Sequence, residues 1–177
     1  MFRFIMILIA VGSNLPHPEH GAPRDVCKAA VDAVEAAGCE ILARSRWYRS
    51  SPVPASGQPD FVNGVVSVRT TRNPAELLAD LHDIEARFDR VRSEPNAART
   101  LDLDLIDYDG MVNPGPKAPL LPHPRMAARA FVLLPLRDIA PGWKHPVLGE
   151  TLEALIGALS GDQRCTPIAP PDGAEGA

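Results

Sequence analysis

The sequence predicts an α+β domain in which helices cover an antiparallel sheet. Segments with strand-like and helix-like patterning follow one another in the order β-α-β-β-α-β, and further apolar helical segments come after them. Of the 177 residues, 45% are hydrophobic, which is enough for one buried core. Because no internal repeat and no long linker divides the chain, we expect a single domain.

The first half of the chain contains two predicted strands around one helix. Residues 4–11 form an apolar run that resembles a signal peptide, but it has no small-residue cleavage site and is too short to span a bilayer. We interpret it as a buried strand, with either Met1 or Met6 as the start of the protein. Residues 24–37 place apolar side chains at helical spacing, and residues 40–48 have the pattern of a second strand.

The next elements are separated by loops rich in proline and glycine. Residues 49–60 are such a loop, and the alternating residues 61–69 then form a strand. Asn73 and Pro74 are typical of a helix start, because asparagine caps the first turn and proline lacks the N–H that would be unpaired there. Residues 99–110, RTLDLDLIDYDG, are leucine-rich and end in an Asp-Gly turn, which favours a fourth strand.

Two helices, near residues 131–139 and 150–159, complete the predicted elements. Their order matches the ferredoxin-like βαββαβ pattern, which predicts an antiparallel sheet with helices on one face, here with extra C-terminal helices. We expect residues 1–161 to form the domain and the Pro- and Gly-rich residues 162–177 to form a flexible tail.

Composition argues against several classes of function. The net charge of −4 and the 5% aromatic content disfavour a general nucleic-acid-binding protein and a stacking surface for single strands. Cys27, Cys39 and Cys165 have no metal-ligand spacing and are interpreted as buried free thiols in a reducing compartment. We expect a cytoplasmic monomer that acts on small molecules and binds neither nucleic acid nor membranes.

The fourth predicted strand carries two carboxylates side by side. Residues two apart on a strand share a face, so Leu101, Leu103 and Leu105 face a core while Asp102 and Asp104 face the other way together. Adjacent carboxylates repel each other unless a cation or a proton intervenes. Mg2+ is typically held by one or two carboxylates, with water and substrate phosphates as the other ligands. The pair indicates a metal–phosphate site, although the solvated face of an edge strand explains the same pattern.

Basic residues flank the two aspartates in sequence. Arg90, Arg92 and Arg99 precede them, and guanidinium groups suit paired contacts with phosphate oxygens. His123 and Arg129 follow in the segment LPHPRMAARAF. A surface basic loop and an exposed Pro-rich turn explain these segments when each is taken alone.

Two further segments suit a flat ligand. Phe61 and Asn63 share a face of their strand, where a ring and a carboxamide can stack on and hydrogen-bond a heterocycle. Gly12 and Asn14 follow the first strand, where glycine permits close backbone approach and asparagine bonds a ligand or its own turn. A core phenylalanine and a simple turn are the plainer explanations of these segments.

Six motifs, in their order along the chain, resemble the 6-hydroxymethyl-7,8-dihydropterin pyrophosphokinases (HPPK) of folate biosynthesis. They are GSNL, YRSSPV, QPDFVN, IEARFDRVR, RTLDLDL and LPHPRMAARAFVLLPL, spread over roughly residues 7–160. The resemblance implies a 2-amino-4-hydroxy-6-hydroxymethyldihydropteridine diphosphokinase, which transfers a diphosphate from ATP to the pterin hydroxymethyl group and releases AMP.

The resemblance also implies roles for individual residues. Asp102 and Asp104 would bind two Mg2+ ions, and catalysis would involve them together with Arg90 and Arg92. The residues implied in ATP binding are His82, Glu85, Arg90, Arg92, Arg99, His123 and Arg129. The residues implied in pterin binding are Ser50, Pro52, Val53, Phe61, Asn63 and Phe131.

Some positions depart from the family pattern. Asp89 stands where the family generally has glycine before its arginine, and His82 stands where glutamine is common. Residues 117–121 lack the arginine and threonine that some relatives place around ATP. The departures concern the contacts with adenosine and the basic loop at 89–98. We expect the loops at 49–60 and 89–98 to act as lids that exclude water.

Two alternatives remain at this point. A nucleic-acid-binding ferredoxin-like module would need exposed aromatic residues on its middle strands and a basic sheet surface. Another Mg2+-dependent nucleotidyl or phosphoryl transferase would release ADP or pyrophosphate rather than AMP.

Overall fold

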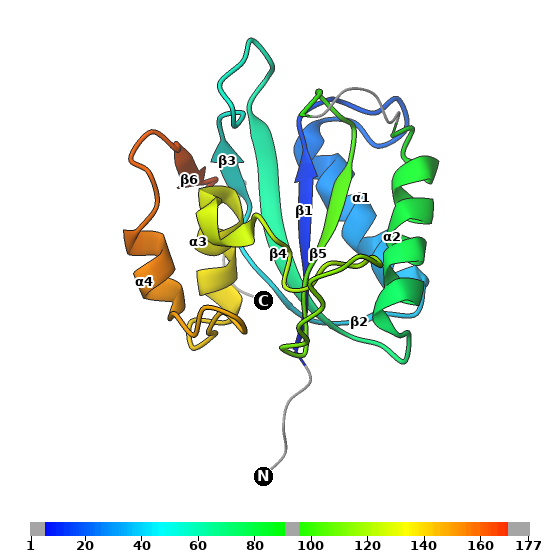
Figure 1. The fold of residues 1–177 in the computed structure, drawn as a ribbon. Helices are drawn as coiled ribbons and strands as arrows, with labels where there is room; N and C mark the ends of the chain where they lie inside the picture. Colours follow the sequence, from blue (N-terminus) through cyan, green and yellow to red (C-terminus); the bar gives the residue numbers. More distant parts are fainter. Residues whose placement is uncertain (1–5, 91–95, 170–177) are drawn as a thin grey trace.

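The computed structural model of the protein describes residues 6–90 and 96–169 (Figure 1). Its strands are β1 (Ile7–Ser13), β2 (Glu40–Arg44), β3 (Tyr48–Ser50), β4 (Phe61–Arg69), β5 (Asp102–Tyr108) and β6 (Cys165–Pro167). Its helices are α1 (Pro23–Ala36), α2 (Pro74–Arg87), α3 (Ala130–Ile139) and α4 (Leu152–Gly157), with a 3-10 turn, η1, at Met126–Ala128. Within the described residues, every helix is too short or too polar to cross a membrane.

The strands form one open sheet in the order β5-β1-β4-β3-β6. The first residues of β4 pair with β3, and its last residues pair with β2. Each of these pairings is antiparallel. The expected antiparallel sheet is therefore confirmed, with β1 and β4 as its central strands.

Helices α1 and α2 cover one face of the sheet. Ile7, Ile9 and Val11, which alternate along β1, join Val31 of α1 and Leu81 of α2 in one buried cluster. Burial of apolar side chains from three elements in one cluster is the main favourable contribution to folding. This layer agrees with the predicted placement of the first two helices.

Helices α3 and α4 pack on the opposite face, which corrects the expectation of helices on one face only (Figure 1). Leu8 of β1, Val65 of β4 and Ile106 of β5 join Leu133 and Leu136 of α3 in a second buried cluster. The central strands are apolar on both faces because both are covered by helices. The second layer covers only part of its face and leaves the end near the start of β5 open to a cavity.

Helix α2 begins where the sequence predicts. The Asn73 side chain accepts hydrogen bonds from the backbone N–H groups of Ala75 and Glu76, and the Glu76 side chain accepts one from the Asn73 backbone. This capping box pairs donors that would otherwise be unpaired at the helix start. It anchors a helix whose last turn brings Glu85 beneath the cavity.

The predicted strand at 40–48 is two strands, β2 and β3. The ladder with β4 is interrupted where Trp47 lies over Gly64, so close that a β-carbon there would meet the indole ring at 2.7 Å. Ser45 bridges the gap, because its Oγ accepts a hydrogen bond from the Val65 N–H at 2.9 Å. Glycine at position 64 therefore leaves room for the indole ring at the point where the ladder is interrupted.

Part of the expected tail at 162–177 pairs with the sheet. Residues Cys165–Pro167 form β6, which pairs with β3. On either side, the Ser51 N–H donates to the Arg164 carbonyl at 3.2 Å and the Ile168 N–H donates to the Trp47 carbonyl at 2.8 Å. Ordered structure thus continues past residue 161, and residues 170–177 lie outside the described part.

Strand β5 contains a β-bulge that determines which way its side chains face. Its register against β1 shifts between Leu8 and Ile9. Leu103 and Leu105 face the α1/α2 cluster and Ile106 faces the α3/α4 cluster, as strict alternation requires. Asp107 then faces the α3/α4 side as well, where it contacts Trp143, and Tyr108 packs against the α1/α2 cluster. The alternation predicted from the sequence therefore holds up to Ile106 and shifts by one residue at the bulge.

Candidate active site

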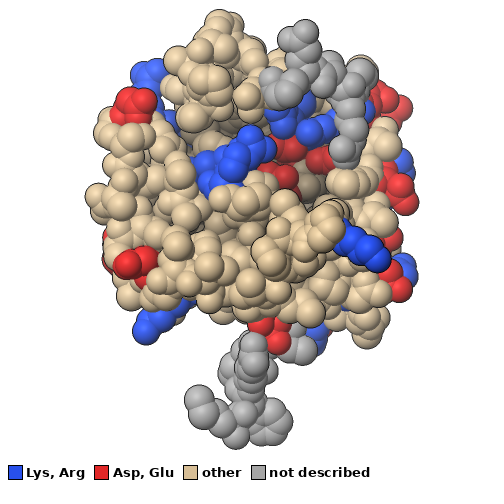
Figure 2. All heavy atoms as spheres, in the orientation of Figure 1, with Lys and Arg blue, Asp and Glu red and all other residues tan. Residues whose placement is uncertain are grey.

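The open end of the second sheet face forms a cavity of about 350 Å3. Figure 2 shows the hollow in the upper half of the molecule, with arginine side chains at its edge and acidic side chains inside it. The structure brings these predicted residues together around the cavity: Ser50, Pro52, Val53, Phe61, Asn63, Arg90, Arg99, Asp102, Asp104, Arg129 and Phe131.

The remaining predicted residues lie elsewhere. Glu85 and His123 stand just behind the lining, where they contact lining residues. His82 is exposed on α2 and does not line the cavity. Arg92 lies outside the described residues.

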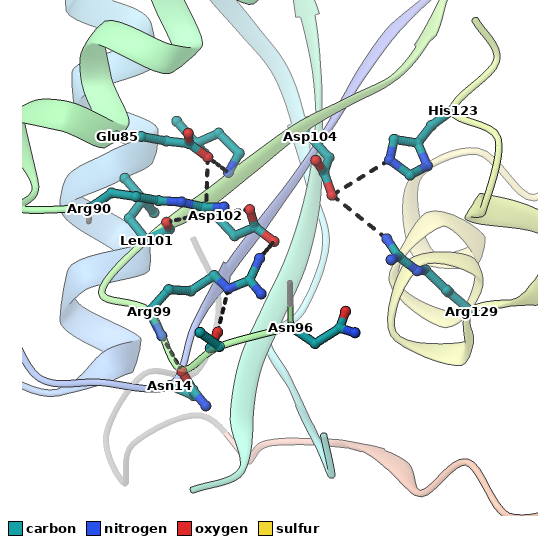
Figure 3. A network of polar contacts seen from close by, with 12 residues as sticks. Asn14, Glu85, Arg90, Asn96, Arg99, Leu101, Asp102, Asp104, His123 and Arg129 are labelled. Atoms are coloured by element: carbon teal, nitrogen blue, oxygen red, sulfur yellow. Dashed lines mark hydrogen bonds and ion pairs between the residues drawn. The ribbon is translucent and has the colours of Figure 1, made fainter. Parts of the chain in front are cut away.

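Asp102 is held by two arginines (Figure 3). Arg90 forms an ion pair with its Oδ1, and the Arg99 Nη1 donates to its Oδ2 at 3.0 Å. The same Arg90 Nη1 donates to the Leu101 carbonyl at 2.7 Å and to Glu85 Oε1 at 3.3 Å. Asp102 is therefore neutralised by direct contacts with guanidinium groups.

Glu85 is a buried carboxylate that supports this arrangement. Its side chain is 5% exposed, and its Oε1 accepts a hydrogen bond from the Leu103 backbone N–H at 2.8 Å. Burial by itself lowers the pKa of Arg90, but the charges of Asp102 and Glu85 outweigh it and raise the pKa. Arg90 is thus fixed as a cation between α2 and β5.

Among the described residues, Asp104 has no such direct contact with a guanidinium group. Arg129 Nη1 lies 3.8 Å and His123 Nε2 lies 3.9 Å from its carboxylate, both across the cavity from α2 (Figure 3). Burial raises the pKa of Asp104, and the neighbouring charge of Asp102 raises it further. The carboxylate is thus held in a site that favours a further cation beside it.

His123 and Arg129 form the basic wall opposite Arg90. Burial lowers the pKa of His123, although the charge of Asp104 acts in the other direction. Burial also lowers the pKa of Arg129, with Arg125 adding repulsion. A bound anion would stabilise the positively charged forms of both groups, because it would compensate the energetic cost of burying their charges.

The other end of the cavity suits a flat polar ligand. The Asn63 side chain donates to Ser50 Oγ at 2.8 Å, and both residues are buried. Gly12 lies against it, since a β-carbon at Gly12 would sit 3.0 Å from the Asn63 oxygen. Phe61 and Phe131 also line this end, and the Arg129 guanidinium lies 5.2 Å from the Phe131 ring centroid.

Asn14 joins the two loops that flank the cavity. Its side chain donates to Gln58 Oε1 at 3.2 Å and to the Pro59 carbonyl at 3.1 Å, and it accepts from the Arg99 N–H at 2.8 Å. Gln58 also donates to the Asn96 carbonyl at 2.8 Å. Asn14 was predicted from the sequence as a possible ligand contact, but the role of Gln58 was not. Its partners, Asn14 and Asn96, are distant in sequence, so no local pattern indicates them.

The donor set fits a hard divalent cation. Among the described residues, no group of three or more His, Cys, Asp or Glu side chains is placed to hold a metal. Two carboxylates without further protein ligands suit Mg2+, which commonly keeps water and substrate phosphates in its coordination sphere. The Asp104 carboxylate lines the cavity, with Arg129 at 3.8 Å and His123 at 3.9 Å, so such an ion would reach it from the cavity.

Comparisons with known proteins agree with this geometry. The family model described as 7,8-dihydro-6-hydroxymethylpterin-pyrophosphokinase matches residues 8–141. The chain is 43% identical to 2-amino-4-hydroxy-6-hydroxymethyldihydropteridine pyrophosphokinase of Synechocystis sp., over 76% of the chain and 67% of that protein. It is 39% identical to the protein of the same name from Pseudomonas aeruginosa, over 86% of the chain and 90% of that protein.

The fold also resembles a solved structure. The crystal structure of Plasmodium falciparum HPPK-DHPS, as the S436F/A437G/A613S triple mutant with SDX-DHP, matches with a TM-score of 0.66 and 15% identity. The match covers 86% of the present chain and 44% of that one, so the chain spans less than half of this larger protein. On its sequence relatives and its matched family model, the chain belongs to the 7,8-dihydro-6-hydroxymethylpterin-pyrophosphokinase (HPPK) family.

Proposed function

We propose that the cavity binds ATP and 6-hydroxymethyl-7,8-dihydropterin side by side and transfers the terminal diphosphate of ATP to the pterin hydroxyl group. One observation carries this proposal. The lining of a single cavity includes a carboxylate pair with arginines from β5 and its flanking segments, and two phenylalanines with a buried carboxamide from β4 and α3. The first set suits a metal-bound polyphosphate and the second suits a heterocycle.

Asp102 and Asp104 would hold two Mg2+ ions in this proposal. The ions would neutralise charge on the attacking and leaving oxygens of the transfer. Arg90 and Arg99 each form an ion pair with Asp102. With cations beside Asp102, both guanidinium groups become available to the phosphates of ATP, as does Arg129 from the opposite wall.

The aromatic end would bind the pterin. Phe61 and Phe131 would lie against the faces of the ring, and the Asn63 carboxamide would bond its polar edge. Ser50 already accepts a hydrogen bond from Asn63, so the carboxamide is held in one orientation. Pro52 and Val53 would form the wall that shields this end from water.

Catalysis in this proposal depends on alignment and charge. The hydroxyl oxygen attacks the β-phosphorus and AMP leaves, and the residues around the cavity hold both reactants in line. No side chain is assigned as a general base. Arg92 remains a candidate ATP ligand, and the contacts of His82 with ATP remain a prediction.

We also assign the strand order β5-β1-β4-β3 with β2 to the ferredoxin-like class. Its support is the antiparallel pairing of β1 with both β4 and β5, the strands on either side of α2 in sequence. A single domain that acts as a cytoplasmic monomer without nucleic acid is part of the same proposal.

Product analysis tests the proposed reaction. The protein is incubated with ATP, Mg2+ and 6-hydroxymethyl-7,8-dihydropterin, and nucleotides are separated by anion-exchange chromatography. We expect AMP in equal amount to the pterin diphosphate, and no AMP when the pterin is omitted. Release of ADP or pyrophosphate would instead indicate a different transferase on this scaffold.

A further inference from the structure

Asp89 makes the turn that connects α2 to Arg90. Its backbone has a left-handed φ of 56°, a conformation that residues other than glycine seldom adopt. The next residue, Arg90, donates its backbone N–H to the Glu85 carbonyl at 3.1 Å and forms an ion pair with Asp102. The turn at Asp89 therefore sets the direction in which Arg90 enters the cavity.

His17 contacts the Asp89 side chain from a distant part of the sequence. Its Nε2 lies 3.1 Å from Asp89 Oδ2, and its side chain is 4% exposed. The His17 Nδ1 accepts a hydrogen bond from the Glu19 N–H at 3.1 Å, so neutral His17 carries its proton on Nε2. Among the described residues Nε2 has no aligned hydrogen-bond partner. This buried N–H therefore depends on the nearby Asp89 carboxylate for its compensation.

His17 is itself fixed in place. Its backbone N–H and carbonyl exchange hydrogen bonds with Gly21 at 2.9 and 2.8 Å, and its ring centroid lies 5.9 Å from that of Phe88. Two residues earlier, the Leu15 N–H donates to the Arg99 carbonyl at 3.3 Å. The loop after β1 thus contacts the chain next to Arg90 and again at Arg99.

We propose that His17 and Asp89 form a positioning pair that holds Arg90 for binding of the ATP phosphates. The inference rests on the proposed function, because it takes Arg90 as a phosphate ligand. Neither residue of the pair lines the cavity, so both act through the backbone that leads to Arg90. Without the pair, the Arg90 side chain would no longer be held in the orientation that points toward the phosphates. The pterin end is built from β3, β4 and α3 and would be unaffected.

Two substitutions remove the contact between His17 and Asp89 and keep the local packing and backbone conformation. His17→Phe keeps a ring against Phe88 and removes the N–H, whereas Asp89→Gly keeps the left-handed turn and removes the carboxylate. His20→Phe is the matched control, because His20 packs on His17 at 4.7 Å and stacks on Phe88 at 4.5 Å, a phenylalanine keeps both ring contacts, and no contact of His20 with Asp89 is found in the described structure.

The readout is the KM for ATP set against the KM for the pterin. We expect each single substitution to raise the KM for ATP roughly threefold to tenfold, with the pterin KM unchanged. The double variant should be no worse than the worse single one, because the two residues make one contact. The Kd of a nonhydrolysable ATP analogue with Mg2+, measured by calorimetry, should rise by the same factor, and His20→Phe should change neither value.

Three results would overturn the positioning role. They are an unchanged ATP KM in Asp89→Gly, additive effects in the double variant, and an equal rise of both KM values, which indicates a structural role only. If His17→Phe does not fold, Asp89→Gly decides alone, since the Asp89 side chain is 72% exposed. Failure of the proposed function is distinguishable, because the unsubstituted protein would then release no pterin-dependent AMP.

Discussion

Two aspartates of strand β5, Asp104 and Asp107, have opposite surroundings. Asp107 accepts hydrogen bonds from Trp143 Nε1 at 2.7 Å and from the Gly110 N–H at 2.9 Å. Asp104, three residues earlier, has Arg129 and His123 at 3.8 and 3.9 Å and the charges of Asp102 and Arg90 nearby. Burial raises the pKa of both carboxyl groups.

The difference separates a carboxylate that supports the fold from one that we propose binds a ligand. Neutral donors contact Asp107 and leave it 2% exposed. Asp104 keeps 32% of its side chain exposed and lines the cavity, with Arg129 and His123 farther from it than a hydrogen bond reaches. Direct contact with fixed donors supports the fold, whereas a gap lined by charge leaves room for a ligand.

The largest effect is expected for Asp104→Asn. The substitution should lower kcat by more than about 100-fold, since loss of groups that merely orient metal ligands already costs about 10–100-fold. The free energy of unfolding should stay the same or rise, because a buried charge is removed. Steady-state assays at saturating Mg2+ and urea denaturation measure the two quantities. Activity within a few-fold of the unsubstituted protein would contradict the metal assignment.

Asp107→Asn should show the reverse pattern. One carboxylate oxygen becomes an amide that cannot accept from Trp143, so the free energy of unfolding should fall by about 1–3 kcal/mol. Because Asp107 lies outside the cavity, kcat and both KM values should stay unchanged. Urea denaturation and activity assays of the folded protein measure these quantities. A large loss of kcat without loss of stability would contradict a purely structural role for Asp107.

Phe131→Ala tests whether the cavity has separate subsites for the pterin and for ATP. If the phenylalanine stacks on the pterin, its removal should cost about 1–3 kcal/mol of pterin binding, the range found for stacking on nucleobases. The affinity for the ATP analogue should change little, since the phosphates lie at the other end. Calorimetry with each ligand in turn measures both, and equal losses would argue against separate subsites.

The smallest effect is a pH dependence of stability at Asp107. Because burial raises its folded-state pKa above the ordinary 3.8, the native state binds more protons than the unfolded state between those two values. Stability contributed by this group therefore falls as pH rises through that window. The charged Asp109 and the nearby His145 face the same site.

The stability advantage over Asp107→Asn should accordingly be smaller at pH 7 than at about pH 4. Urea denaturation of both proteins across that range, at constant ionic strength, measures it. An advantage that grows with pH would show that Asp107 is better stabilised as a charged group than its burial implies.

Local patterns in the sequence were enough for much of the fold. The alternation at 61–69 gave β4 with its observed bounds, and Asn73 with Pro74 gave the start of α2. The second helical layer was missed, because the apolar residues on both faces of the first strand were interpreted as one buried run. The strand at Cys165–Pro167 was missed because a proline-rich end gives no strand pattern of its own.

The site shows the same division between local and distant information. Strand periodicity predicted that Asp102 and Asp104 share a face, and both line the cavity. Their different partners depend on Arg90, Arg129 and His123, which arrive from separate elements and have no spacing rule. The contact between His17 and Asp89 joins residues 72 positions apart (89 − 17), so no local pattern could predict it.

The pairing of β6 with β3 has a practical consequence for anyone who shortens this chain. Deletion from residue 162 onward would look harmless from the amino-acid sequence, yet it would uncover the backbone of Tyr48–Ser50 and create a new sheet edge prone to association with other chains. It would also remove the Arg164 carbonyl that restrains Ser51, next to Ser50 and Pro52 in the cavity wall. Under the proposed function, truncation would thus reduce solubility and also weaken binding of the pterin.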